Sequence, residues 1–349
     1  MKKVALTLAS FVLGTSLFAE GLSVSGYLRG GFTDTTAAPK YTTDTWLDGD
    51  YFGGSSRIRV NIDYEKDFGG VTFRYQDTGM SDFFDESTVA YAMAYANFLD
   101  GKIIAEGGVL TDRFTSSAGW EDTSFDGGKG VRLVVAPVEG LYLTAQAADN
   151  FAETYANTDK EVIEGDAETG DIKFNEKLLA FTAKYGNDDF FVTGGAAVAK
   201  KFYGSLGYTG VKGLTLVAEG IYDSTDATKA YYDDNALTTI VLWAEYTGVE
   251  NLTLGIDSYI NLTKDDNDDS LTFVTINPAV SYNFTKVISA ALDATVNISS
   301  DDDVDTYATI TPSLTFNASE KASATLYGTI STDTDQASHR IGAGVKYAF

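Results

Sequence analysis

The residues best suited to chemistry in this chain are charged, and they form two groups. The first is basic, and none of the chain's seven arginines lies between residues 133 and 339. Six of them fall on the polar side of segments with alternating polarity: Arg29, Arg57, Arg59, Arg74, Arg132 and Arg340. The second group is acidic and lies in the segment 111–129. Its members are Asp112, Glu121, Asp122 and Asp126. Across a narrow water-filled gap, two such groups create a transverse field that favours polar solutes.

Candidates for catalysis and metal binding are scarce. The chain has no cysteine and one histidine, His339, so a metal-ligand set and a Ser-His pair both lack partners. The acidic runs 265–269 and 301–305 lack the glycine and distal glutamate of a dedicated calcium loop, which favours solvated outer loops. A net charge of -25 is hostile to nucleic acid. We therefore predict no enzyme, no cofactor, no bound metal and no nucleic-acid partner.

Short segments of alternating polarity must position these charges. In residues 57–65, apolar Ile58, Val60 and Ile62 alternate with polar and charged residues. The same period of two recurs near 252–261 and 288–298. Strands of about ten residues with one apolar and one polar face match those that cross a bilayer at a tilt. Gly, Tyr, Phe, Thr and Val are abundant, which also favours strands.

The first 19 residues have the pattern of a secretory signal peptide. Lys2 and Lys3 form a basic start, an apolar run extends from Val4 to Phe18, and Ala19 is a small residue for cleavage. The run is shorter than the ~20 residues of a spanning helix. We expect the mature domain to comprise residues 20–349.

The connections between strands alternate between short turns and longer polar loops. Eight short turns are predicted near 65–70, 99–102, 137–140, 186–189, 210–213, 247–251, 283–286 and 317–321. Two of them carry almost the same motif, YTGVKGLTL at 208–216 and YTGVENLTL at 246–254. With nine longer loops, the count is eighteen strands, or sixteen if 198–201 is not a loop. Pro278 and Pro312 fall inside predicted strands, where we expect a bulge or an early end of the ladder.

Most strands that run towards a short turn end in an aromatic residue on the apolar face. These are Tyr64, Phe98, Tyr185, Tyr208, Tyr246, Tyr282, Phe316 and Phe349. Aromatic rings suit a bilayer interface, so a row at one height predicts the girdle of a transmembrane barrel. A soluble β-sandwich could use aromatics in its core, but it has no reason to repeat them at every second strand end.

The chain ends in GVKYAF, with Val345, Tyr347 and Phe349 on one face. The chain resembles the bacterial outer-membrane porin superfamily in this ending, in its signal peptide, in its alternation of short turns and long loops, and in its aromatic girdle. The resemblance covers the whole mature chain. No subfamily is assigned. The resemblance implies an all-β fold, a transmembrane antiparallel β-barrel with short periplasmic turns and long extracellular loops. It also implies that the barrel-assembly machinery reads the terminal Phe349, that lipid surrounds the barrel, and that the protein forms a homotrimer.

The resemblance further implies how the charged groups act. In general-diffusion porins the third loop folds inward and its carboxylates face wall arginines across a constriction, and segment 111–129 has the corresponding place. Because the last strand of a barrel pairs with the first, Arg340 would join Arg29, Arg57, Arg59 and Arg74 on one basic side. The expected function is passive diffusion of small polar solutes and ions in the cell outer membrane, with a weak preference for cations.

Two alternatives stay open. One is a barrel that serves as a surface protein for adhesion or antigenic display. The other is a carbohydrate-selective channel, which needs an aromatic track along the lumen. Lumen-facing aromatics such as Tyr27, Tyr142 and Tyr259 are too scattered in the sequence to reveal one.

Overall fold

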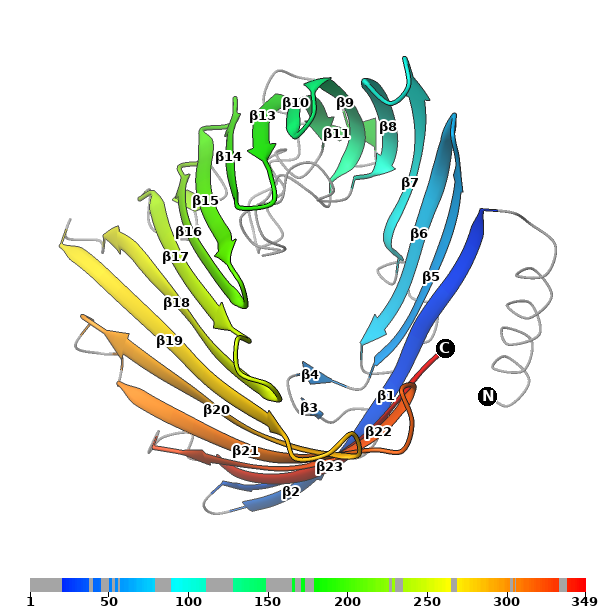
Figure 1. Cartoon of the computed structure of the whole chain (residues 1–349). Helices are drawn as coiled ribbons and strands as arrows, with labels where there is room; N and C mark the ends of the chain where they lie inside the picture. The colour runs from blue at the N-terminus through cyan, green and yellow to red at the C-terminus, as the bar shows by residue number, and fades with distance from the viewer. Residues whose placement is uncertain are drawn as a thin grey trace.

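Eighteen antiparallel strands form a closed barrel in the computed structural model (Figure 1). The structure describes residues 21–37, 40–44, 50–51, 54–55, 57–78, 89–110, 128–148, 165–166, 171–172, 179–225, 228–229, 235–264, 269–301, 304, 306–332 and 338–349. The predicted signal peptide, residues 1–19, lies outside these ranges. No helix in the described part of the chain has the length and apolar character needed to cross a membrane.

The first half of the wall consists of β1 (Leu22–Ala37), β5 (Arg57–Lys66), β6 (Gly69–Thr78), β7 (Val89–Phe98), β8 (Ile103–Val109), β9 (Lys129–Val138), β10 (Leu141–Ala148), β13 (Leu179–Gly186) and β14 (Phe190–Ala197). The second half consists of β15 (Lys201–Val211), β16 (Leu214–Asp223), β17 (Leu237–Tyr246), β18 (Leu252–Lys264), β19 (Ser270–Asn283), β20 (Ile288–Ser299), β21 (Tyr307–Asn317), β22 (Ala322–Ser331) and β23 (Ser338–Ala348). A further strand, β2 (Lys40–Asp44), forms a hairpin with residues Thr33 to Ala37 of β1. Two small hairpins complete the described strands: β3 (Asp50–Tyr51) with β4 (Gly54–Ser55), and β11 (Gly165–Asp166) with β12 (Asp171–Ile172).

Pairing of the first strand with the last closes the barrel. β1 pairs with β5 from Leu22 to Arg29 and with β23 from Tyr27 to Ala37. The terminal Phe349 extends this ladder, because its N–H donates to the carbonyl of Gly26 at 3.0 Å and its carbonyl accepts from the N–H of Gly26 at 3.2 Å. A Cβ at Gly26 would lie 2.7 Å from the Phe349 ring. The glycine therefore makes room for the terminal aromatic side chain.

The connection at 198–201, which decided between sixteen and eighteen strands, is a tight turn. Residues 198–200 separate β14 from β15, and the N–H of Lys200 donates to the carbonyl of Ala197 at 3.0 Å. Lys200 adopts a φ of 67°, a conformation that tight turns impose on one residue. The prediction of eighteen strands is confirmed. All eight predicted short turns also lie between consecutive wall strands.

The expectation for the two prolines was wrong. β19 continues through Pro278, where its ladder with β20 pauses between the pairs Ile276–Val296 and Ala279–Asp293 and then resumes in the same register. β21 likewise continues through Pro312. Each proline is paired on its other side, so the missing N–H removes bonds on one edge without a bulge or an early end.

Seven of the eight predicted girdle residues lie beside short turns, the eighth is the terminal Phe349, and all share the outer face with apolar neighbours. Seven are 37–52% exposed, and Tyr64 is partly buried between its register partners Leu22 and Val71. Other aromatic residues lie next to this row; for example, the ring centres of Tyr185 and Phe190 are 5.9 Å apart. This is the placement expected of an interfacial belt.

The two YTG motifs form neighbouring corners of the barrel. In each motif the tyrosine ring covers the glycine two residues later, since a Cβ would lie 2.8 Å from the Tyr208 hydroxyl at Gly210 and 2.4 Å from the Tyr246 hydroxyl at Gly248. The corners also touch, because the N–H of Thr247 donates to the carbonyl of Gly213 at 2.6 Å. The repetition is therefore one turn design used twice side by side.

Candidate functional site

The two faces of the wall differ in the way that the sequence alternation predicts. On β9, Val131 and Leu133 are 61% and 48% exposed on the outer face, whereas Arg132 and Val134 between and after them are buried on the inner face. The inner face carries most of the charged side chains and a series of polar contacts between neighbouring strands. We therefore take the inner, lumen-facing wall as the candidate functional site.

One side of the lumen wall is basic. Tyr27 on β1 pairs with Arg59 on β5, and Arg29 pairs with Lys346 on β23. Arg74 on β6 joins them through its pair with Asn61. We call Arg29, Arg59, Arg74 and Lys346 the basic arc. The backbone of Arg57 is in register with Arg29, and the side chain of Arg57 lies outside the described part of the chain.

Arg340 lies away from the basic arc. Its register partner on β1 is Thr35, six residues beyond Arg29, which corresponds to about 20 Å along the strand. The sequence predicts that the first and last strands pair, and Arg340 was grouped with the other arginines on that basis. The position of Arg340 along the barrel axis depends on the register of the two strands, which the sequence does not give. Lys346, which the sequence interpretation missed, occupies the place expected for Arg340. The alternation that puts Arg340 on the inner face could also have revealed Lys346.

Neutral neighbours orient the basic arc. Nε of Arg59 donates to Oε1 of Gln76 at 2.8 Å, and its guanidinium carbon lies 5.3 Å from the centre of the Tyr27 ring. Nζ of Lys346 lies 4.9 Å from the centre of the same ring. Nε of Arg74 donates to Oδ1 of Asn61 at 2.8 Å. Gln76, Asn61 and Tyr27 carry no charge, so these contacts hold the cations in position without adding a negative charge.

Arg132 faces the lumen but is buried in an ion pair. Its Nη1 lies 3.0 Å from Oε2 of Glu106, and both side chains are fully buried. Its Nε donates to Oε1 of Gln146 at 3.0 Å. A buried arginine that is paired and hydrogen-bonded contributes little charge to the lumen. The structure therefore separates Arg132 from the other predicted wall arginines.

Arg132 is not an isolated case, because many inner-face residues from β8 to β16 are buried. Thr193, Ser205 and Glu219, which lie in one row on β14, β15 and β16, are 2%, 6% and 3% exposed. We call the inner face of β8 to β16 the buried wall. The inner face of β17 to β20 is different, because its charged residues are partly exposed.

The base of the third long connection lies inside the barrel. The N–H of Leu110 donates to the carbonyl of Gly128 at 2.9 Å, and this bond closes the connection at its two ends. The Leu110 side chain is 1% exposed and packs with Met93 and Ala148 on the inner face. The predicted loop carboxylates Asp112, Glu121, Asp122 and Asp126 lie outside the described residues.

A second charged side of the lumen is acidic. Glu245 on β17, Asp257 on β18 and Asp293 on β20 face inward, and we call these three the acidic wall. Nδ2 of Asn277 donates to Oδ2 of Asp257 at 2.7 Å. Over the described part of the chain, none of the three carboxylates forms an ion pair. The same part holds no group of three or more acidic or histidine side chains arranged to bind a metal.

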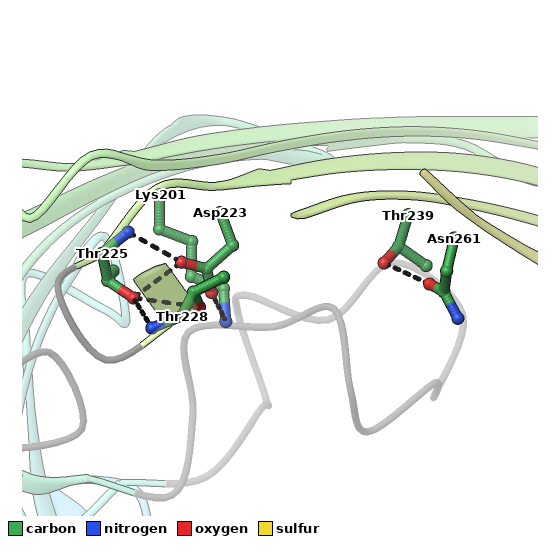
Figure 2. A network of polar contacts seen from close by, with 6 residues as sticks. All are labelled: Lys201, Asp223, Thr225, Thr228, Thr239 and Asn261. Carbon is green, nitrogen blue, oxygen red and sulfur yellow. Dashed lines mark hydrogen bonds and ion pairs between the residues drawn. The ribbon is translucent and has the colours of Figure 1, made fainter. Parts of the chain in front are cut away.

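At the outer rim, hydrogen bonds and an ion pair tie strands to a loop (Figure 2). Nζ of Lys201 lies 3.5 Å from Oδ2 of Asp223, and Oδ1 of the same carboxylate accepts bonds from the N–H and hydroxyl of Thr225 at 3.0 and 2.7 Å. The Thr225 hydroxyl accepts the N–H of Thr228 at 3.3 Å, as an N-cap does for a helical turn. Nearby, Thr239 donates to Asn261 at 2.7 Å.

No family model and no curated protein matches this sequence. Solved structures do match it over most of its length. The anion-selective porin from Comamonas acidovorans has a TM-score of 0.55 at 11% identity, with 94% of this chain and 99% of that chain covered. OmpF of Salmonella typhi, solved with daunomycin, has a TM-score of 0.53 at 12% identity, with 94% and 97% covered. OccAB1 of Acinetobacter baumannii has a TM-score of 0.53 at 11% identity, with 95% and 97% covered.

These likenesses establish the fold. The chain shares the β-barrel fold of these outer-membrane proteins, which confirms the fold that the sequence resemblance implied. What each of those proteins transports is a property of that protein.

Proposed function

We propose that this protein is an outer-membrane porin, a water-filled channel for passive diffusion of small hydrophilic solutes and ions. The observation that carries the proposal is the closed eighteen-strand barrel with an apolar outer face and a charged inner face. A barrel of sixteen to eighteen strands is wide enough to leave an aqueous lumen. An apolar outer face bounded by an aromatic row suits lipid.

The localisation and the partners follow from the same features. The predicted signal peptide exports the chain, and the barrel inserts into the outer membrane with its short turns on the periplasmic side. Phe349, which pairs with Gly26 at the barrel seam, is the residue that we propose the assembly machinery reads. The mature protein assembles as a homotrimer.

Ion selectivity depends on the charges that water can reach. The basic arc and the acidic wall both border the lumen, and the whole chain carries a net charge of -25. A negative lumen and negative loops raise the local concentration of cations, which gives a weak cation preference. The loop carboxylates Asp112, Glu121, Asp122 and Asp126 would narrow the passage opposite the basic arc. The inward base at Leu110 supports this position for the loop.

Solute uptake into proteoliposomes tests the proposed channel. Vesicles that contain the refolded full-length protein should swell in isotonic glycerol or glucose, and the rate should fall with increasing solute size. Empty vesicles provide the control. Swelling no faster than that of empty vesicles would contradict the channel.

A further inference from the structure

A cavity of about 230 Å³ opens on the inner face of β17 to β20. Its floor is formed by two small residues, Gly255 and Ala279, which pair across β18 and β19. Glu245 pairs with Gly255 on one side, and Asp293 pairs with Ala279 on the other. One row of register therefore places a carboxylate at each side of a floor that has almost no side chains.

The next row of the cavity wall adds an aromatic ring and a third carboxylate. Trp243, Asp257 and Asn277 are register neighbours on β17, β18 and β19, and all three line the cavity. The 2.7 Å bond from Asn277 to Asp257 orients that carboxylate. The faces of indole rings attract cations electrostatically. The cavity thus combines an indole with three carboxylates, none of which is in an ion pair within the described residues.

Gly255 differs from other glycines of the inner face. A Cβ there would meet one atom within 4 Å, the Cβ of Ala279 at 3.9 Å, which is an ordinary contact. Its φ is outside the left-handed region, so neither the backbone nor packing requires a glycine. Elsewhere aromatic rings of opposite strands cover such glycines, in the pairs Gly70–Tyr95, Gly207–Phe191 and Gly342–Tyr327. Close approach of a ligand is one of the reasons for which a strand carries a glycine, and the uncovered Gly255 leaves the space for it.

We propose, building on the proposed channel function, that this cavity binds a substituted ammonium ion and so gives the channel a class of preferred solute. A volume of about 230 Å³ equals the liquid volume of about eight water molecules, which suits a cation of about seven to ten non-hydrogen atoms. The three carboxylates supply charge-assisted contacts and Trp243 supplies a cation–π contact. A sugar could bond to the same groups, but it would leave three negative charges uncompensated.

Isothermal titration calorimetry on the refolded full-length barrel in detergent tests this site. The probe is choline, and its control is 3,3-dimethylbutan-1-ol, which has the same shape without the charge. Choline should bind with a Kd of about 1 mM or below in low salt, and the neutral alcohol at least about tenfold more weakly. The variants Trp243→Leu and Asp293→Asn should each weaken choline binding by about tenfold.

Two further variants separate a built site from general charge. Gly255→Leu fills the floor while all three carboxylates remain, so it should abolish choline binding. Asp63→Asn removes an inner-face carboxylate of β5 that accepts a bond from Thr72, and it should leave choline binding unchanged. Heat-modifiable gel mobility checks the folding of each variant. If Gly255→Leu fails to fold, the losses of choline binding in Trp243→Leu and Asp293→Asn still test the site.

Three results would overturn the site: equal binding of choline and the neutral alcohol, equal losses in Asp63→Asn and Asp293→Asn, or tighter binding of glucose than of choline. The calorimetry needs no conductance. Choline binding by a protein without channel activity would therefore overturn the proposed function alone. Channel activity without choline binding would overturn this site alone.

Discussion

The basic arc and the acidic wall carry opposite charges in the same lumen, and they are built differently. Neutral partners orient the cations of the arc: Gln76 and Tyr27 hold Arg59, and Asn61 holds Arg74. The carboxylates of the wall instead border a cavity. Two strands, β21 and β22, separate the two regions on one side, and eight strands separate them on the other.

The difference shows how one barrel can assign separate tasks to its charges. Neutral groups fix the position of the arc cations, so the arc suits a contribution of fixed geometry to the potential in the lumen. A carboxylate beside open space can accept a solute directly. The buried wall from β8 to β16 forms a third region, in which the ion pair of Arg132 and Glu106 is removed from water.

The largest effect is expected where charge is buried. Arg132→Met leaves Glu106 without its buried partner, which should lower the free energy of unfolding by about 3–5 kcal/mol. Ion selectivity should stay unchanged, because water does not reach this pair. Urea unfolding of the protein in lipid vesicles measures the loss, and Arg132→Met combined with Glu106→Leu should recover most of it. Altered selectivity with unchanged stability would show that the pair belongs to the conducting part of the wall.

The next effect is on selectivity and comes from the acidic wall. Replacing Glu245 by Gln and both Asp257 and Asp293 by Asn removes three negative charges from the open lumen. The ratio of cation to anion permeability should fall on the order of threefold. Reversal potentials under a salt gradient measure this ratio, with Asp63→Asn as the control that removes one inner-face carboxylate elsewhere. An unchanged ratio would mean that permeating ions do not sense this wall.

The basic arc should act in the opposite direction and more weakly. Arg59→Ala combined with Arg74→Ala should raise the preference for cations by about twofold, because the strongly negative chain already favours them. The effect should shrink at about 1 M salt, where the Debye length is about 3 Å. Arg340→Ala, some distance along β23 from the arc, is the control and should change the reversal potential less. Equal shifts in both variants would argue against a localised arc.

The smallest effect is expected at the outer rim. The ion pair between Lys201 and Asp223 is partly exposed, with side-chain exposures of 24% and 16%. Lys201→Ala should therefore cost about 1 kcal/mol or less and leave selectivity unchanged. Thermal unfolding in detergent measures the cost. A loss as large as that of Arg132→Met would show that the rim contributes as much to stability as the buried wall.

Local patterns predicted most of the fold. Each short turn could be predicted because turn residues interrupt an alternation of period two, and the YTG corners show this most clearly. The outward direction of Tyr208 and Tyr246 follows from the same alternation. Pro278 and Pro312 were misjudged because the sequence does not tell which edge of a strand can spare a hydrogen bond.

The candidate site was harder to predict because it depends on register across several strands. The cavity needs Glu245, Gly255, Ala279 and Asp293 in one row on four strands. Each of these residues is unremarkable in its own segment. The height of Arg340 and the role of Lys346 likewise depend on how far β23 slides along β1. The burial of Arg132 depends on Glu106 and Gln146, which lie on neighbouring strands.

Single-channel recording in planar bilayers tests the central claim most directly. The refolded full-length protein should produce discrete conductance steps in a simple salt solution, and these steps should persist in Lys201→Ala, whose change lies at the rim. Steps of uniform size indicate a water-filled lumen of fixed width. Incorporation of the folded barrel without any stepwise conductance would contradict the account of this protein as a porin.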